Sequence, residues 1–374
     1  MYSLMKQTFI IFLSLIISSL AYSKTLYVPS QYTKIQEAVD AASYGDIIEV
    51  ADGTYKGEGN ININIPRNKI TLQSANGPFN CILDCENEGR AFLIENNEKY
   101  IVIDGFTILN GDESYGGAIF CSNSYPTIKN CVIKNNKASN GGGFYINNKD
   151  DSISVKIINC LFVSNTARGY GGGIFKQWGY IIVSNSNFID NSSLSVTEHS
   201  GGIYTFTNRT IVNNSIFWNN TPKCIYRMNS IVNINHSFID SDNNNLPDTC
   251  FNSCIFGNDP GFLLPEYKLK NDSPCKDSGS IGDDIPLTDI IGNNRKGLVD
   301  IGVFEYQQSY PGLKGDFNND SYVGLSDVLS ILQYILNGTP IIDNAKGDFT
   351  NDGKVDIFDA VKLVKYITQQ IESL

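Results

Sequence analysis

The sequence predicts a mainly β protein, a right-handed parallel β-helix, followed by a small all-α domain. Two repeat patterns predict this architecture: short units of Gly, Asn and apolar residues recur through the middle of the chain, and a loop-and-helix unit appears twice near the C-terminus. The composition agrees, because 41% of the 374 residues are hydrophobic and only 18% are charged. Such a composition excludes a disordered or coiled-coil protein.

The N-terminal segment, residues 1–23, predicts a secretory signal peptide. Lys6 precedes an apolar run from Phe9 to Leu20, and the small residues Ala21 and Ser23 then stand three and one positions before Lys24. The run is shorter than a comfortable membrane span, and no second run of spanning length follows. We therefore expect a secreted, extracellular protein that is mature from about Lys24 and has no membrane span after the signal peptide is removed.

The net charge limits which partners the protein can have, and the cysteine count limits how its thiols can pair. The net charge is −11, from 28 basic and 39 acidic residues, and an acidic surface repels phosphate. We therefore expect no nucleic-acid partner. Nine cysteines are an odd number, so at least one is unpaired or bonded to another chain, and the sequence does not give the pairing. We interpret Cys131 and Cys160 as small, buried apolar residues rather than as partners in a disulfide.

Two short units alternate through the middle of the chain. The first is a glycine pair followed by apolar residues, and its second glycines are 26, 30 and 29 residues apart. It occurs at Gly116-Gly117-Ala118-Ile119, Gly142-Gly143-Phe144-Tyr145, Gly172-Gly173-Ile174-Phe175 and Gly201-Gly202-Ile203-Tyr204. The second is Phe-x-x-Asn, at Phe162–Asn165, Phe188–Asn191 and Phe217–Asn220, with weaker copies at Ile133–Asn136, Phe238–Ser241 and Ile255–Asn258.

These repeats predict that residues 24–306 form the β-helix. Short strands at this period suit coils stacked about 4.8 Å apart, each touching only its neighbours. The asparagines at the same corner of each coil are expected to form a ladder of side-chain amides. The phenylalanines three positions earlier are expected to point inward and stack.

The start of this region predicts a helix that caps the first coil. Thr33-Lys34-Ile35-Gln36 is interpreted as a capping box, and Ile35, Ala38, Val39 and Ala42 follow at helical spacing. The sequence from Gly45 to Tyr55 then predicts a strand and a turn that open the coils. Covering the first coil protects an edge that would otherwise aggregate.

Three segments resemble known families. The helix with Gly-Asp-Ile-Ile-Glu-Val (45–50) and Asp-Gly-Thr-Tyr (52–55) is similar to the start of many pectate-lyase-like β-helix proteins. The paired Gly-Gly-x-Ile and Phe-x-x-Asn units look like the repeats of the polymorphic outer-membrane proteins. The segment from Asp259-Pro260-Gly261-Phe262 to Tyr306 resembles the closing segment of exported β-helix proteins with varied surface anchors. The resemblance covers most of residues 25–306 and is specific for fold rather than for chemistry.

After a linker at 307–313, residues 314–374 contain a duplicated calcium-loop pattern. Lys314-Gly315-Asp316-Phe317 recurs 32 residues later as Lys346-Gly347-Asp348-Phe349. Calcium binds oxygen ligands at positions 1, 3, 5, 7, 9 and 12 of a short loop. The expected ligands of two calcium ions are Asp316, Asn318, Asp320, the Tyr322 carbonyl and Asp327 in loop one, and Asp348, Thr350, Asp352, the Lys354 carbonyl, Asp356 and Asp359 in loop two.

An apolar helix face is expected after each loop. The faces are Val328, Ile331, Leu332, Ile335 and Leu336, and then Val361, Val364, Ile367 and Ile371. Two loop-helix copies with Asp at position 12 look like a dockerin module. The resemblance implies a cohesin partner on a scaffold or surface protein, as in cellulosomes. It also implies cohesin contacts at loop positions 10 and 11, which here are Leu325, Ser326, Ile357 and Phe358.

Whether the β-helix catalyses a reaction stays open at this point. Dockerins mostly accompany polysaccharide-degrading enzymes, so a polysaccharide lyase or an O-glycosyl hydrolase is one alternative. The other is a non-catalytic, glycan-binding or adhesin-like surface protein. The sequence assigns no catalytic residue, and the loops that precede each glycine pair give the groove candidates, for which solvated loop tips are the competing interpretation. These candidates are Lys137, Arg168, Tyr170, Glu198 and His199.

Overall fold

The structure is a computed structural model, and two units are described separately: Met1–Glu305 and Tyr306–Leu374. The described residues are 23–66, 69–95, 99–195, 199–240, 246–282, 284–295, 298–306, 315, 317, 323–337, 347–350 and 352–368. The predicted signal peptide therefore lies outside them, except for its last residue. No helix within these ranges is both long and apolar enough to cross a membrane.

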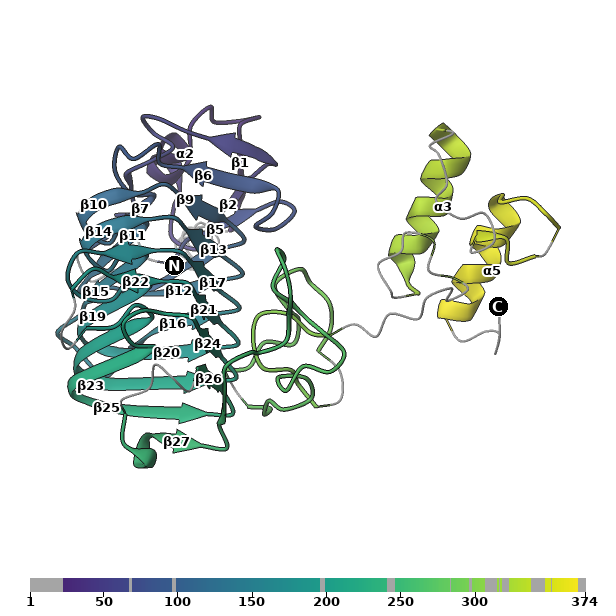
Figure 1. The fold of residues 1–374 in the computed structure, drawn as a ribbon. Coiled ribbons are helices and arrows are strands. Elements are labelled where there is room, and N and C mark those ends of the chain that lie inside the picture. The colour runs from purple at the N-terminus through teal and green to yellow at the C-terminus, as the bar shows by residue number, and fades with distance from the viewer. Residues whose placement is uncertain are drawn as a thin grey trace, which may run out of the picture. The chain divides into compact units, whose positions relative to one another are not determined.

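The first unit is a stack of parallel strands wound as a solenoid (Figure 1). One half of its 15-stranded sheet runs through β1 (Thr25–Val28), β2 (Ile47–Val50), β5 (Thr71–Ser74), β8 (Lys99–Asp104), β12 (Tyr125–Lys129), β16 (Ser154–Ile158) and β20 (Tyr180–Ser184) to β23 (Ile203–Asn213). The other half returns through β19 (Ile174–Trp178), β15 (Phe144–Asn147), β11 (Ile119–Ser122), β7 (Phe92–Ile94) and β4 (Ile63–Asn64), while β25 (Ile225–Asn235) and β27 (Phe251–Asn252) extend the sheet beyond β23.

Two further parallel sheets close the coils. A nine-stranded sheet contains β3 (Gly53–Tyr55), β6 (Cys81–Asp84), β9 (Thr107–Leu109), β13 (Val132–Lys134), β17 (Leu161–Val163), β21 (Asn187–Ile189), β24 (Ile216–Trp218), β26 (Phe238–Asp240) and β28 (Ile255–Gly257). A four-stranded sheet contains β10 (Asp112–Tyr115), β14 (Lys137–Asn140), β18 (Thr166–Ala167) and β22 (Ser192–Ser193). The predicted parallel solenoid is confirmed.

The predicted asparagine ladder is confirmed. The side-chain amide of Asn136 donates to the amide oxygen of Asn165, Asn165 donates to Asn191, and Asn191 donates to Asn220, each at 2.9 Å. All four side chains are fully buried. The main-chain N–H groups of Asn136, Asn165 and Asn191 donate to the same amide oxygens, at 3.0–3.1 Å. The ladder therefore satisfies buried polar groups that a coil corner would otherwise leave without partners.

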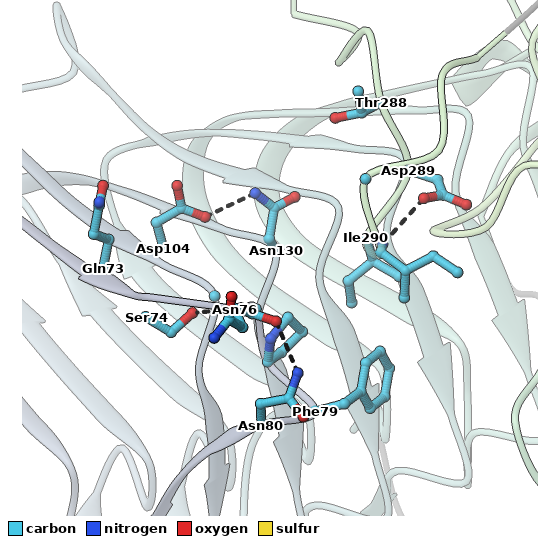
Figure 2. Close-up of a pocket in the computed structure, with 15 residues that line it drawn as sticks. Gln73, Ser74, Asn76, Phe79, Asn80, Asp104, Asn130, Thr288, Asp289 and Ile290 are labelled. Carbon is cyan, nitrogen blue, oxygen red and sulfur yellow. Dashed lines mark hydrogen bonds between the residues drawn. The ribbon is translucent and has the colours of Figure 1, made fainter. Parts of the chain in front are cut away.

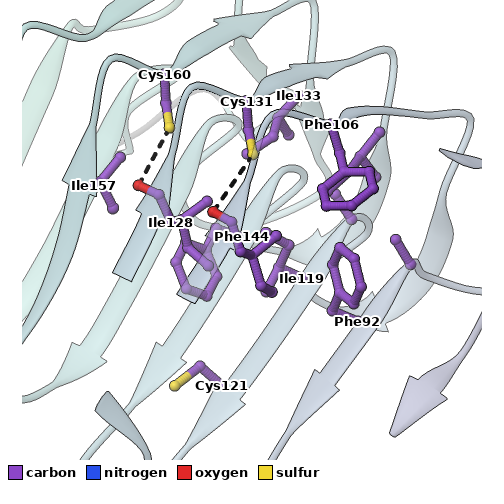
Figure 3. Packing of buried hydrophobic residues seen from close by; sticks show 14 of the residues in the cluster. Phe92, Phe106, Ile119, Cys121, Ile128, Cys131, Ile133, Phe144, Ile157 and Cys160 are labelled. Atoms are coloured by element: carbon purple, nitrogen blue, oxygen red, sulfur yellow. Dashed lines mark hydrogen bonds between the residues drawn. The ribbon is translucent and has the colours of Figure 1, made fainter. Parts of the chain in front are cut away.

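The predicted phenylalanine stack is also confirmed. The rings of Phe162 and Phe188 are 4.7 Å apart and nearly parallel, and those of Phe188 and Phe217 are 4.8 Å apart. All three side chains are fully buried in the solenoid core. The other side of the core is filled in the same way, where Phe92, Ile119 and Phe144 lie on neighbouring strands (Figure 3).

Three details of the repeat alignment were wrong. Ile119 pairs with Phe144, 25 residues later, so Gly117 aligns with Gly142 rather than with Gly143. A Cβ on either glycine would lie within 2.5 Å of a carbonyl oxygen of the next coil, which explains why this column is glycine. The weak copies at Phe238 and Ile255 are one residue out of register, because Phe217 pairs with Ile239.

The N-terminal helix α2 (Ile35–Ala41) begins one residue away from the expected cap. Lys34 is its N-cap residue, and the N–H of Lys34 and the hydroxyl of Thr33 both donate to the carboxylate of Glu37. The helix buries Ile35, Ala38 and Val39. The sequence missed β1, which pairs with β2 and lies at the end of the sheet. A capping role for α2 stays a prediction.

Residues 259–306 bind back onto the coil corners. Asn159, Asn185 and Asn214 adopt left-handed backbone conformations and donate their side-chain amides to carbonyls of this segment, at 2.7–3.2 Å. Inside it, Arg295 pairs with Glu305 at 3.1 Å, and both side chains are almost completely buried. The segment also contains β29 (Phe262–Leu263) and β30 (Lys268–Leu269), which pair antiparallel, and a 3-10 turn, η2 (Asp248–Cys250), precedes it.

All nine cysteines are free thiols, and all but Cys254 are buried. Burial raises the pKa of Cys81, Cys85 and Cys121 to about 12. The thiols of Cys131 and Cys160 point the same way (Figure 3), and each lies within hydrogen-bond distance of two main-chain carbonyls, one in the neighbouring coil and one two residues earlier in its own coil. They act as small apolar residues of the core, as the sequence predicted.

The sequence did not predict a buried lysine in this core. Lys176 lies on β19 in register with Ile146 and Thr205, and its side chain is fully buried. Its ammonium group donates to the carbonyls of Thr207 and Arg209. Burial lowers its pKa to about 7, because the lost hydration disfavours the charged ammonium group.

Phe188→Ala should lower the free energy of unfolding by about 3–5 kcal/mol, because it opens a cavity in the middle of the stack. Urea unfolding of the protein measures this. Phe256→Ala is the control, since Phe256 is 48% exposed at the last strand of the nine-stranded sheet. Equal losses in the two variants would contradict the stack.

Lys176→Met should be more stable than the wild type near pH 7, and the advantage should shrink as the pH rises. The folded-state pKa of about 7 lies below that of the unfolded chain, so the unfolded state binds more protons between about pH 7 and 10.5. Wild-type stability should therefore rise by roughly 4 kcal/mol across this window relative to the variant. Urea unfolding at both ends of the window tests this, and parallel pH profiles would refute it.

Candidate functional site

The second unit contains two loop-helix copies. Its helices are α3 (Leu325–Asn337) and α5 (Ile357–Ile367), which contact each other. Val328 and Ile331 of α3 pack with Ala360 and Leu363 of α5 around Phe349. The expected face of the first helix is thus correct at Val328, Ile331 and, in part, Leu332.

The expected face of the second helix was wrong at Val361 and Val364 and correct at Ile367, which packs against the core. Val361 and Val364 are 46% and 37% exposed, while Ala360 and Leu363 are buried. The sequence favoured Val361 and Val364 because valine is larger and more apolar than alanine. The carboxylate of Asp359 is buried, however, and this rotation of the helix places Ala360 and Leu363 on its inner face. Ile335 and Leu336 of the first helix are also exposed, and Ile371 lies outside the described residues.

Asp327 and Asp359 close the two loops with the same geometry. The N–H of Phe317 donates to Oδ1 of Asp327 at 2.7 Å, and the N–H of Gly324 donates to Oδ2 at 2.8 Å. The N–H groups of Phe349 and Asp356 bind the two oxygens of Asp359 in the same way, each at 2.8 Å. Both carboxylates are fully buried. A carboxylate at position 12 therefore ties the start of each loop to the helix that follows.

Two other loop-two candidates, Asp348 and Thr350, make hydrogen bonds within the loop. Asp348 accepts the N–H groups of Asp352 and Gly353, at 3.1 and 2.8 Å, and the hydroxyl of Thr350 donates to Asp359 at 3.1 Å. Lys354 and Asp356 also fall within the described residues. Of the loop-one candidates, Asp316, Asn318, Asp320 and Tyr322 lie outside them.

The loop-two donors are hard oxygens, the ligand type that calcium takes, so the residues fit the ion chemically. In the described ranges, however, no three Asp, Glu, His or Cys side chains converge closely enough to hold a metal. Asp348 and Asp359 instead direct their carboxylates at main-chain N–H groups. The calcium ligands therefore stay a prediction.

The four cohesin-contact candidates are exposed. Leu325, Ile357 and Phe358 expose 65%, 49% and 66% of their surface, and Ser326 is exposed as well. The sequence missed two neighbours, Leu329 and Val361, which lie one helical turn further on and are 59% and 46% exposed. Because the copies are 32 residues apart, each copy presents an equivalent apolar pair, Leu325 with Leu329 and Ile357 with Val361.

On the solenoid, the groove candidates lie at the four-stranded sheet. Lys137 is on β14 in register with Asp112 and Thr166, and Arg168 follows β18. Both side chains are exposed. They lie two residues apart in register, so they do not form one column. Glu198 lies outside the described residues.

Tyr170 and His199 are brought together, but as part of an aromatic cluster. Their ring centroids are 4.6 Å apart, and the Tyr170 ring also lies 4.7 Å from Tyr204 and 5.3 Å from Phe175. Tyr170 remains 37% exposed. These two residues therefore cover a buried aromatic layer and present part of it to solvent.

That layer is an aromatic ladder which the sequence reasoning missed. Neighbouring strands pair Phe120, Tyr145, Phe175, Tyr204 and Tyr226 in register on the outward side of the sheet. Successive rings are 5.1–5.5 Å apart. After three of the four glycine pairs, an apolar residue and then an aromatic one follow directly, and this signal could have revealed the ladder.

Exposed tyrosines and cations border the ladder. The Tyr115 ring lies 5.0 Å from Tyr145 and is 45% exposed, and the Lys223 ammonium lies 4.9 Å above the Tyr226 ring. We call the exposed or half-exposed residues of this surface the lateral strip: Tyr115, Lys137, Arg168, Tyr170, Lys223 and Tyr226. It carries tyrosines and positive charges, with Asp112 next to Lys137 in register on the neighbouring strand.

Comparisons with known proteins identify the C-terminal module. Residues 314–368 match the dockerin type I domain. The chain therefore combines a parallel β-solenoid with a dockerin type I domain at its C-terminus.

The solenoid has weaker relatives. A probable autotransporter, YfaL of Escherichia coli (strain K12), is 29% identical over 149 residues, which is 35% of this chain; the chain spans only 12% of that protein's length. Among solved structures, pectate lyase Pel9A is similar with 14% identity and a TM-score of 0.43, covering 77% of this chain and 98% of that one. A pectin methylesterase from Aspergillus niger has 15% identity and a TM-score of 0.37, covering 64% and 86%. At these identities and TM-scores, the structural similarities carry no information about chemistry.

Proposed function

We propose that this is an exported protein whose dockerin domain binds a cohesin module on a scaffold or surface protein, and whose solenoid contacts polysaccharide through the lateral strip. The duplicated carboxylate geometry of Asp327 and Asp359 carries the docking part of the proposal, together with the family match of residues 314–368. The exposed residues Leu325, Ser326, Ile357 and Phe358 form the cohesin-binding surface.

Calcium is the cofactor, with one ion in each loop. Asp348, Thr350, Asp352, the Lys354 carbonyl, Asp356 and Asp359 would hold the ion of loop two, and Asp327 would contribute to that of loop one with Asp316, Asn318, Asp320 and the Tyr322 carbonyl. The ion neutralises acidic residues that repel one another in its absence. Because the loops also position the two helices, ion binding contributes to the folding free energy of the domain.

The lateral strip suits a glycan chain. A tyrosine ring offers an apolar face for the C–H groups of a sugar and a hydroxyl for hydrogen bonding. Lys137, Arg168 and Lys223 add positive charge, which attracts acidic sugars to an otherwise acidic protein. In this role the protein holds polysaccharide for breakdown on the scaffold.

A catalytic role is the second candidate, as a polysaccharide lyase or a glycoside hydrolase. The exposed position of Arg168 beside Tyr170 favours it, since a basic group next to a bound sugar can act on it. Screening pectins, xylans and alginates for unsaturated products and new reducing ends separates the candidates. Turnover that is lost in Arg168→Ala supports an enzyme, whereas binding without turnover supports a glycan-binding or adhesin-like protein.

Asp327→Asn/Asp359→Asn should lower calcium affinity by more than about tenfold and abolish binding to immobilised type I cohesin. Each change removes a negative ligand and keeps only one of the two oxygens that accept main-chain N–H groups. Calorimetric calcium titration of the protein measures the first effect. The control is Asp248→Asn, an exposed residue of the solenoid. Unchanged calcium and cohesin binding in the double variant would refute the docking proposal.

Arg168→Ala/Lys223→Ala should weaken retention of the protein on an acidic polysaccharide by at least severalfold at low salt. The matched control is Lys69→Ala/Arg209→Ala, which removes the same charge at two cations outside the strip that, like Lys223, lie over tyrosine rings, at 5.2 and 5.8 Å. Affinity electrophoresis in gels containing pectate gives the comparison. Equal retardation of both double variants would show that only net charge matters.

A further inference from the structure

A second surface of the solenoid has the features of a ligand pocket. It is a cavity of about 450 Å³ between the turn after β5 and residues 288–292 (Figure 2). Asp104 and Asn130 also line it, joined by a hydrogen bond of 2.7 Å. The volume is within the usual range for small-molecule sites. The cavity lies at a different corner of the coils from the lateral strip, so it is a separate candidate site.

The walls of this pocket are fixed. The carbonyl of Thr288 accepts the side-chain amide of Asn159 at 2.7 Å, and the N–H of Ile290 donates to Val303 at 3.0 Å. Asp289 is 2% exposed and accepts N–H groups of Ile291, Asn293 and Glu305. On the opposite wall, the amide of Asn76 donates to both carboxylate oxygens of Asp52, at 3.1 Å. A pocket whose walls are held this way binds without first having to order them.

The lining is rich in acceptor oxygens. Asp104 accepts the Asn130 amide at 2.7 Å and pairs with Lys129 at 2.9 Å, which leaves acceptor capacity on its two oxygens. Asn76 and Asn80 use their NH₂ groups within the wall, so their amide oxygens can still accept. Such a set of groups favours a ligand that carries several O–H donors.

The charge of the pocket lining and the ring of Phe79 limit the class of ligand further. None of the described residues that line the pocket is Lys or Arg, so an anionic group would find no cation in the lining. Lys129 neutralises Asp104, which disfavours a cationic ligand. Phe79 is 52% exposed on the lining, and its ring offers an apolar face. Hydroxyl groups around an apolar C–H face are the features of a neutral sugar.

We infer that this pocket binds a neutral glycosyl residue. The site is independent of the lateral strip, whose positive charges suit acidic sugars. The solenoid thus presents two glycan-contacting surfaces of different charge at different corners of its coils.

Calorimetric titration of the protein with xylohexaose, cellohexaose and mannohexaose, and with trigalacturonate as the acidic probe, tests this inference. At least one neutral hexaose should bind. Its affinity should fall more than tenfold in Phe79→Ala, which removes the ring, and in Ile291→Trp, which fills the pocket from a 46% exposed position without removing a polar group. Phe256→Ala, a half-exposed ring elsewhere, should bind as the wild type does.

Failure of this inference is distinguishable from failure of the lateral strip. Arg168→Ala/Lys223→Ala should leave binding of the neutral hexaose unchanged, and Phe79→Ala should leave binding of trigalacturonate unchanged. The inference is overturned if no neutral probe binds, or if Phe79→Ala and Ile291→Trp, shown to be folded by unchanged melting, bind it like the wild type.

Discussion

The in-register stacking of one coil on the next is the constraint on which the rest of the solenoid depends. A parallel stack repeats each side chain above its copy, so any position that is polar and buried must find its partner in the next coil. The ladder of Asn136, Asn165, Asn191 and Asn220 meets this requirement, because each of the first three amides donates to the next, and the amide oxygens of the last three each accept both a side-chain and a main-chain N–H. The glycine columns meet the matching steric requirement, since a Cβ there would collide with the next coil.

The same register creates the candidate glycan surfaces. Phe162, Phe188 and Phe217 stack inside the coils. Because the same register also aligns the outward residues, the aromatic side chains there stack into a ladder as well. The neutral pocket depends instead on residues 259–306, which attach to the left-handed asparagine corners. Function on this fold therefore arises from what the repeat leaves outside its core. Lys176 is the one ionisable ammonium group described inside the stack, where its neighbours in register are Ile146 and Thr205.

The repeated features were predictable from the sequence and the unrepeated ones were not. The asparagine ladder and the phenylalanine stack could be predicted because each copy repeats the same residue at the same spacing. The first glycine pair was misaligned because three consecutive glycines at 141–143 offer two registers, and only the carbonyl contacts decide between them. On α5, Val361 and Val364 were wrongly expected to be buried because valine is more apolar than alanine, whereas Ala360 and Leu363 follow the buried Asp359 on the inner face and Ile367 packs there as expected. The neutral pocket joins residues about 200 positions apart, for example Asn76 and Thr288, so no local pattern indicates it.

The central claim is that one chain joins two separate binding activities, calcium-dependent docking at the C-terminus and glycan contact on the solenoid. The most direct test is an assay of the complex of polysaccharide, chain and cohesin. The chain is first bound to an insoluble polysaccharide, such as cross-linked pectate prepared without calcium. A labelled type I cohesin is then added. The account predicts that the cohesin is retained only when the chain and calcium are both present, and that a chelator releases the cohesin while the chain stays on the polysaccharide. Retention of the cohesin without calcium, or failure of the chain to hold any glycan while it binds cohesin, would contradict the account.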